Sequence, residues 1–119
     1  MLTREFADHF ADDWIASWNA HDLARILAHY HEDFRMASPR IAVVAGEPSG
    51  VLRGKAAVGA YWARALALQP QLRFELLHTL VGADSLVLVY RGPRGTSAEH
   101  FEFDERLQVV RASAHYLPA

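Results

Sequence analysis

The segment WIASWNAHDLARILAHYHEDFRMASP, residues 14–39, decides the fold. It reads as the end of one amphipathic helix, a tight corner, a second helix and then a strand. The strand stops at Ser38-Pro39, because proline has no N–H to donate to a sheet. The chain after this segment consists mainly of further strands. We therefore expect helices that close over a curved sheet, with a pocket between the two layers.

Upstream, the first helix is predicted to begin after Thr3, since threonine is a good N-cap residue. Its apolar side chains recur every four residues, which is typical of a helix that faces a core: Phe6, Phe10, Trp14 and Trp18. Residues 19–22 interrupt this stripe, and Asp22 can cap a second helix. The apolar residues of the second helix also keep helical spacing: Leu23, Ile26, Leu27 and Tyr30.

Downstream, apolar residues alternate from residue 34, which predicts a strand that ends at Pro39. We predict a short strand at 41–46, a turn at 47–50 and a second short strand at 51–54. A third helix then runs to Pro70. From residue 71 strands alternate with turns, which predicts an antiparallel meander of about four strands.

Length and composition narrow the class of protein. The 119 residues are expected to form one domain, residues 1–119. The net charge of -2 provides no basic face for nucleic acid. The chain has no cysteine, which suits a reducing cytoplasm, and no apolar run long enough to span a membrane. We expect a cytoplasmic protein without a nucleic-acid or membrane partner.

The order of these elements resembles the nuclear transport factor 2-like superfamily, in particular its SnoaL-like branch, which also holds the ketosteroid isomerases. Short motifs along the whole chain carry the resemblance: residues 18–23, 30–34, 38–39, 52–55, 82–85 and 101–105. It implies an α+β, cystatin-like cone, in which three helices pack on a strongly curved, mainly antiparallel sheet that encloses a pocket. It also implies a homodimer through the outer face of the sheet. Such proteins include isomerases, dehydratases, cyclases, epoxide hydrolases and noncatalytic binding modules.

The isomerase pattern is largely missing. Ser38 stands where the isomerases have a general-base aspartate, and a hydroxyl without a partner base is not basic at neutral pH. Trp14 and Trp62 stand in place of two tyrosines, and an indole cannot relay a proton. Glu99 takes the position of an oxyanion-hole aspartate. Ketosteroid isomerisation is therefore not expected.

Glu99 is the first candidate for a catalytic group. It shares a strand face with Phe101 and Phe103, so it should point into an aromatic pocket that raises its pKa. In the alternative, an arginine or the indole N–H of Trp14 or Trp62 holds this carboxylate for structural reasons only.

His78 and Ser38 are the other catalytic candidates. His78 alternates with Phe74 and Leu76, which predicts an inward imidazole that acts as a general base or polar anchor. A core histidine bonded to a backbone carbonyl is the alternative. Ser38 could donate a hydrogen bond to a substrate carbonyl.

Aromatic residues are expected to form the ligand-binding walls: Trp14, Trp18, Phe34, Tyr61, Trp62, Phe74 and Phe101. His29 and His31 lie two residues apart and would face different ways on a helix, so we expect neither a metal nor another cofactor.

Two functions remain open. In the first, the chain is a cofactor-independent enzyme of the isomerase, cyclase or dehydratase type, in which Glu99 or His78 moves a proton on a small hydrophobic substrate. In the second, it is a noncatalytic dimeric module of the same fold, which binds a small molecule or has a structural role.

Overall fold

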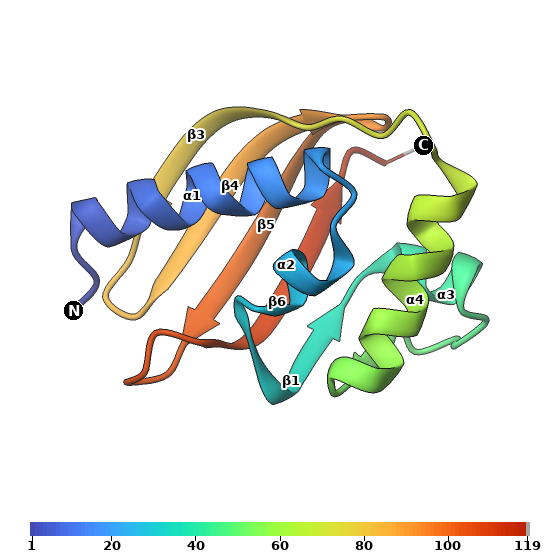
Figure 1. Ribbon diagram of the computed structural model, residues 1–119, viewed down its shortest axis with the longest axis horizontal. Coiled ribbons are helices and arrows are strands. Elements are labelled where there is room, and N and C mark those ends of the chain that lie inside the picture. The colour runs from blue at the N-terminus through green and yellow to red at the C-terminus, as the bar shows by residue number, and fades with distance from the viewer. Residues whose placement is uncertain (119) are drawn as a thin grey trace.

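The structure, a computed structural model, describes residues 1–118. Figure 1 shows helices packed on one side of a curved sheet. The helices are α1 (Arg4–Asn19), α2 (Leu23–Leu27), α3 (Pro39–Val44) and α4 (Lys55–Leu68). The strands are β1 (Tyr30–Ala37), β2 (Val51–Arg53), β3 (Glu75–Val81), β4 (Ser85–Gly92), β5 (Gly95–Phe103) and β6 (Val109–Tyr116).

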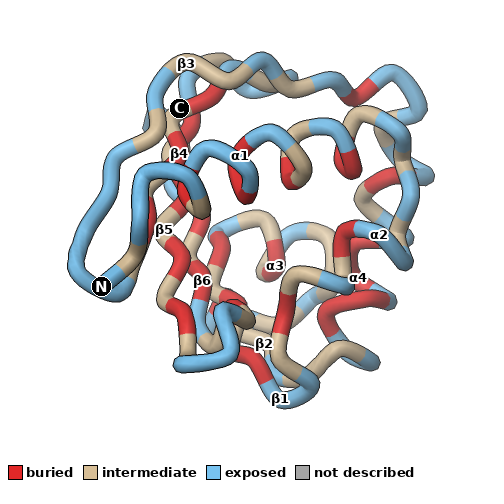
Figure 2. Tube along the Cα trace, turned by 60° about the vertical axis from the view of Figure 1, so that its left-hand side comes forward, coloured by how far each residue is buried: buried red, intermediate tan, exposed pale blue. Residues whose placement is uncertain are grey.

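The six strands form one sheet in the order β2-β1-β6-β5-β4-β3. Strands β3 to β6 form the predicted antiparallel meander, and β1 joins it by pairing parallel to β6. Buried residues alternate with less buried ones along β4, β5 and β6 (Figure 2), so one face of the sheet meets the helices. The α+β class with a curved, mainly antiparallel sheet is confirmed.

The two N-terminal helices begin as predicted. The Thr3 hydroxyl accepts a hydrogen bond from the Phe6 amide, and the Asp22 carboxylate accepts one from the Arg25 amide. The second helix is shorter than its apolar spacing indicates, because Tyr30 already belongs to β1. Pairing of Tyr30 with Val109 of β6 outweighs the helical pattern there.

The predicted strand at 41–46 is wrong, because Pro39–Val44 forms the helix α3. Ser38 caps this helix: its hydroxyl accepts a hydrogen bond from the Arg40 amide at 3.1 Å. Proline at the first helical position loses no hydrogen bond. The β-branched residues suggest a strand, yet only Ile41 is buried, and Val43 is 69% exposed. The predicted strand at 51–54 is confirmed as β2.

The corner after α1 fixes the start of the meander. The Asn19 side-chain amide donates to the carbonyl of Phe74 at 2.9 Å and accepts from its N–H at 2.7 Å. His21, whose φ of 54° is left-handed, places its Nε2 atom 2.9 Å from the Leu72 carbonyl. These contacts hold residues 72–74 against the end of α1, so Phe74 stacks on Trp14 with ring centroids 5.7 Å apart.

Among residues 1–118, no helix combines the length and the apolar character that crossing a membrane requires.

We predict that Asn19→Ala lowers the free energy of unfolding by about 1–3 kcal/mol, because a backbone donor and a backbone acceptor lose their partner. Urea unfolding would measure the change. The control is Gln71→Ala, which removes an exposed amide from the same loop and should change the free energy by less than about 0.5 kcal/mol. Equal stability of the two variants would contradict the role assigned to Asn19.

Candidate functional site

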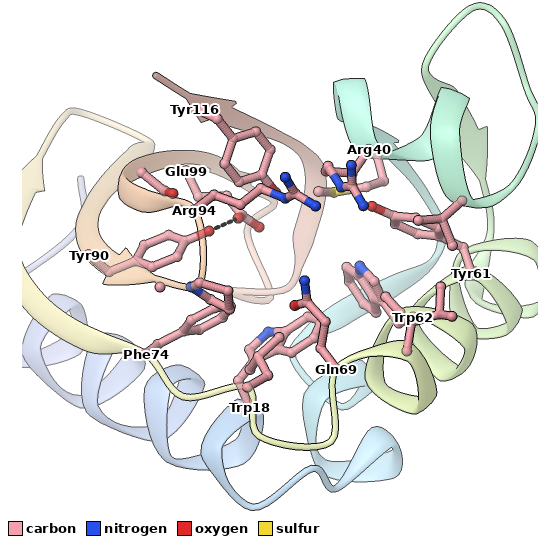
Figure 3. A pocket seen from close by; sticks show the side chains of 18 of the residues that line it. Trp18, Arg40, Tyr61, Trp62, Gln69, Phe74, Tyr90, Arg94, Glu99 and Tyr116 are labelled. Carbon is pink, nitrogen blue, oxygen red and sulfur yellow. Dashed lines mark hydrogen bonds between the residues drawn. The ribbon is translucent and has the colours of Figure 1, made fainter. Parts of the chain in front are cut away.

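A cavity lies between the helices and the inner face of the sheet (Figure 3). Its volume is about 90 Å³. The lining is mainly aromatic, with several polar groups: Trp14, Trp18, Met36, Arg40, Val44, Tyr61, Trp62, Ala65, Leu68, Gln69, Leu72, Phe74, Tyr90, Gly92, Pro93, Arg94, Ser97, Glu99 and Tyr116.

Glu99 is the buried carboxyl group of this cavity. It lies in the middle of β5, beside Leu88 of β4 and Ala114 of β6, and is only 4% exposed. The Tyr90 hydroxyl donates a hydrogen bond to its Oε1 atom at 3.0 Å. Burial raises the pKa of Glu99 from 4.5 to about 7, and the Tyr90 hydrogen bond opposes the rise. Near neutral pH this carboxyl group can therefore either donate or accept a proton.

Three phenols surround the carboxyl group. Burial and the nearby Glu99 charge raise the pKa of Tyr90, Tyr116 and Tyr61. For Tyr61 and Tyr116, hydrogen bonding to the Ser38 hydroxyl opposes the increase. All three phenols thus stay neutral at physiological pH and keep a hydroxyl hydrogen to donate.

Two arginines border the cavity at one end. Arg40 comes from α3, and Arg94 comes from the turn between β4 and β5. Figure 3 shows both guanidinium groups turned toward the space between Tyr61 and Tyr116. The salt bridges found among residues 1–118 include neither arginine.

The indole groups differ in their hydrogen bonding. Trp14 donates its Nε1 hydrogen to the Tyr30 hydroxyl at 3.0 Å, so it does not hold Glu99. The Nε1 atom of Trp18 is buried and has no hydrogen-bond partner within the described chain. Such buried donors are rare in folded proteins, and this one belongs to a residue of the cavity wall.

The structure brings most of the predicted wall together around Glu99: Trp14, Trp18, Tyr61, Trp62 and Phe74. Phe34 and Phe101 instead lie in the packed core, where they are 1% and 0% exposed, and neither lines the cavity. Ser38 is buried behind the wall and caps α3. Its hydroxyl does not line the cavity, but it opposes the rise in pKa of the Tyr61 and Tyr116 phenols.

The expected inward direction of His78 is wrong, because this residue is exposed and lies outside the cavity. The pairing of β3 with β4 shifts between Leu76, opposite Tyr90, and His78, opposite Val89. This bulge adds one residue to β3, so side chains beyond it reverse their faces. From there His78 cannot act in the cavity as a general base or polar anchor.

Several lining residues escaped sequence reasoning. Tyr90 continues the buried alternation of Leu86 and Leu88, and this parity could have identified it. Tyr116 likewise follows Ala112 and Ala114. Arg40 and Arg94 carried no such signal, because one lies in the helix mistaken for a strand and the other in a turn.

Within the part of the chain that the structure describes, no group of three or more histidine, aspartate or glutamate side chains is placed to hold a metal ion. His29 instead contacts Asp13, with Nε2 and Oδ2 2.8 Å apart.

Comparisons with known proteins agree with this architecture. The family model described as a SnoaL-like domain matches residues 11–113. A SnoaL-like protein of unknown function from Burkholderia thailandensis has 51% sequence identity and a TM-score of 0.93, over 98% of both chains. No curated protein matches this chain.

More distant structures share the fold. A protein with a cystatin-like fold from Methylobium petroleophilum has 18% identity and a TM-score of 0.76, over 99% of this chain and 80% of the other. The epoxide hydrolase/cyclase-like enzyme SalBIII, described in pyran ring formation in salinomycin, has 14% identity and a TM-score of 0.74, over 98% of this chain and 95% of its own.

We predict that the raised pKa of Glu99 makes the protein less stable as pH rises from 4.5 to about 7. In this window the folded chain retains a proton that the unfolded chain has released, so folding is favoured at low pH. Between about pH 5 and about pH 7.5 the loss attributable to this group is about 2 kcal/mol.

Glu99→Gln should remove this pH dependence, because the amide is neutral at every pH and its oxygen can still accept from Tyr90. Urea unfolding of both proteins at the two pH values would measure it. Glu102→Gln is the control, since Glu102 pairs with Arg111 away from the cavity and should leave the dependence in place. A wild-type protein whose stability rises over this window relative to Glu99→Gln would contradict the assignment.

Proposed function

The chain belongs to the SnoaL-like domain family, and on this basis we propose that it is a cofactor-independent enzyme that moves a proton on a small, largely apolar substrate. The observation that carries the proposal is the Glu99 carboxyl group. It is buried among aromatic side chains, it borders the cavity, and its pKa is about 7. A general acid or base is most effective when its pKa lies near the working pH.

The surroundings of Glu99 suit this chemistry. Its ionised form can take a proton from a substrate carbon, while Tyr90 keeps one carboxylate oxygen hydrogen-bonded at 3.0 Å. A substrate that loses such a proton develops negative charge on a conjugated oxygen. The neutral phenols of Tyr61 and Tyr116 can donate hydrogen bonds to that oxygen. Ser38 opposes the rise in pKa of both phenols, and this role needs no basicity of the serine.

An enzyme of similar fold carries out chemistry of the proposed class. SalBIII is described as epoxide hydrolase/cyclase-like, and both of those reactions require proton transfer. At 14% identity the likeness concerns the fold alone, so the proposal rests on Glu99 rather than on that enzyme.

A second candidate is a noncatalytic binding module. It is favoured by the size of the cavity, about 90 Å³. Ligand pockets usually measure about 300–1,000 Å³. All three tryptophans of the chain stand in the wall and occupy much of the space between sheet and helices. A protein of this kind would bind a small molecule without changing it.

The test uses nitrobenzisoxazole, a planar carbon acid that serves as a general probe for a buried base. Transfer of its ring C–H proton to the Glu99 carboxylate breaks the N–O bond, and the electron pair passes to oxygen to give a yellow cyanonitrophenolate. We expect wild-type turnover that increases as pH rises through about 7, where Glu99 ionises. Glu99→Gln should lower the rate at least about 100-fold.

Glu102→Gln and His78→Gln are matched controls, since both residues lie outside the cavity, and both variants should keep the wild-type rate. Thermal unfolding would verify that every variant is folded. Binding of the probe without turnover would favour the noncatalytic module, and turnover that survives in Glu99→Gln would remove Glu99 from the mechanism.

We also propose that the chain forms a homodimer through the outer face of its sheet, as the family resemblance implies. Val87 and Val89 of β4 alternate with the inward residues of that strand and are only half-buried. They stand opposite His100 and Ala98 of β5, so two valines and an alanine lie together on this face. A second copy would cover these side chains.

We predict that Val87→Lys converts a dimer into a monomer, because pairing two copies would bury an unpartnered charge. Light scattering after size-exclusion chromatography would distinguish the 13.3 kDa chain from a particle of twice that mass. Val43→Lys, which alters an exposed residue of α3, should leave the mass unchanged. A monomeric wild-type protein would refute the interface.

A further inference from the structure

We infer that the substrate or ligand of this cavity is a small planar carboxylate, whose anionic oxygens bind between Arg40 and Arg94 and whose apolar part lies against the aromatic wall. The inference deepens the proposed function and rests on its premise that the cavity takes a small molecule.

The two arginines are the first argument. They come from separate elements, α3 and the β4–β5 turn, and both line the cavity. Each places its positive charge close enough to Tyr61 to lower the pKa of that phenol, against the larger effect of burial. Two like charges around one point repel each other. No carboxylate of the described chain forms a salt bridge with either of them. An anion between the guanidinium groups would relieve the repulsion with charge-assisted hydrogen bonds.

The other polar groups of the cavity lining are the second argument. Tyr61 and Tyr116 each present a neutral hydroxyl that can donate. Trp18 contributes a buried indole N–H without a partner among residues 1–118. With the two guanidinium groups, the lining offers more hydrogen-bond donors than acceptors; its side-chain acceptors include Glu99, which accepts from Tyr90, and the oxygens of Gln69 and Ser97. A ligand rich in acceptors and poor in donors matches such a wall, and a carboxylate is a ligand of that kind.

The apolar wall supplies the third argument, which concerns shape. Trp14 and Phe74 stack with an interplanar angle of 16°, and Trp18 lies next to both rings. Flat walls favour a flat ligand, because aromatic surfaces gain most from offset or edge contact with another ring. A volume of about 90 Å³ favours a small ligand over a large polycyclic one.

The experiment compares benzoate with benzyl alcohol, a neutral aromatic molecule of similar size, by isothermal titration calorimetry. We expect wild-type protein to bind benzoate at least about tenfold more tightly, since hydrogen bonds to charged groups are the stronger ones. Arg40→Gln and Arg94→Gln should each weaken benzoate binding about tenfold and leave benzyl alcohol unaffected. The control is Arg91→Gln, which changes the same hairpin outside the cavity wall and should preserve both affinities.

The same titration on Glu99→Gln separates this inference from the proposed catalysis. Benzoate binding should persist in that variant even though proton transfer is lost. Equal affinity for benzoate and benzyl alcohol would overturn the inference, as would failure of benzoate to bind or benzoate binding that is insensitive to both arginine variants. If nitrobenzisoxazole turnover still depends on Glu99 in that case, the proposed function stands without a carboxylate substrate.

Discussion

The start of the antiparallel meander is positioned by the pairing of one side-chain amide with one backbone residue. Asn19 copies the hydrogen bonding of a neighbouring strand, donating to Phe74 and accepting from it. The chain that leaves α4 is thereby fixed at the end of α1 before β3 begins. Phe74 is consequently held flat against Trp14, where it forms a cavity wall. Gly92 allows this position, because a Cβ atom there would lie 3.0 Å from the Phe74 ring.

The aromatic wall surrounds the carboxyl group of Glu99, and burying this group lowers the stability of the protein at neutral pH. A buried carboxylate with one hydrogen bond is poorly solvated, which is why the pKa of Glu99 rises to about 7. An apolar side chain at this position would avoid the loss of stability at neutral pH. Retaining such a group is typical of a site where stability is given up for chemistry or binding.

Sequence reasoning succeeded wherever local pattern and tertiary structure agree. The inward direction of Glu99 follows from strict alternation, because β5 pairs regularly with both neighbours around this residue. The same rule failed for His78, since the bulge in β3 depends on pairing with β4 and has no signature in the local sequence. The prediction of a strand at 41–46 failed for a different reason. The β-branched side chains of this segment suggested a strand, whereas the cap from Ser38 and the proline after it specify a helix.

That helix also explains why the polar end of the cavity could not be predicted. Arg40 reaches the cavity only because Ser38 starts α3 there, and Arg94 reaches it only because the β4–β5 turn lies over the same end. The serine that replaces a general base in the isomerase pattern therefore has a different use. It follows β1, begins the helix that brings a positive charge, and opposes the rise in pKa of the Tyr61 and Tyr116 phenols. The proposed general base of the cavity, Glu99, lies instead on β5, so proton transfer and anion binding are assigned to different residues of one small space.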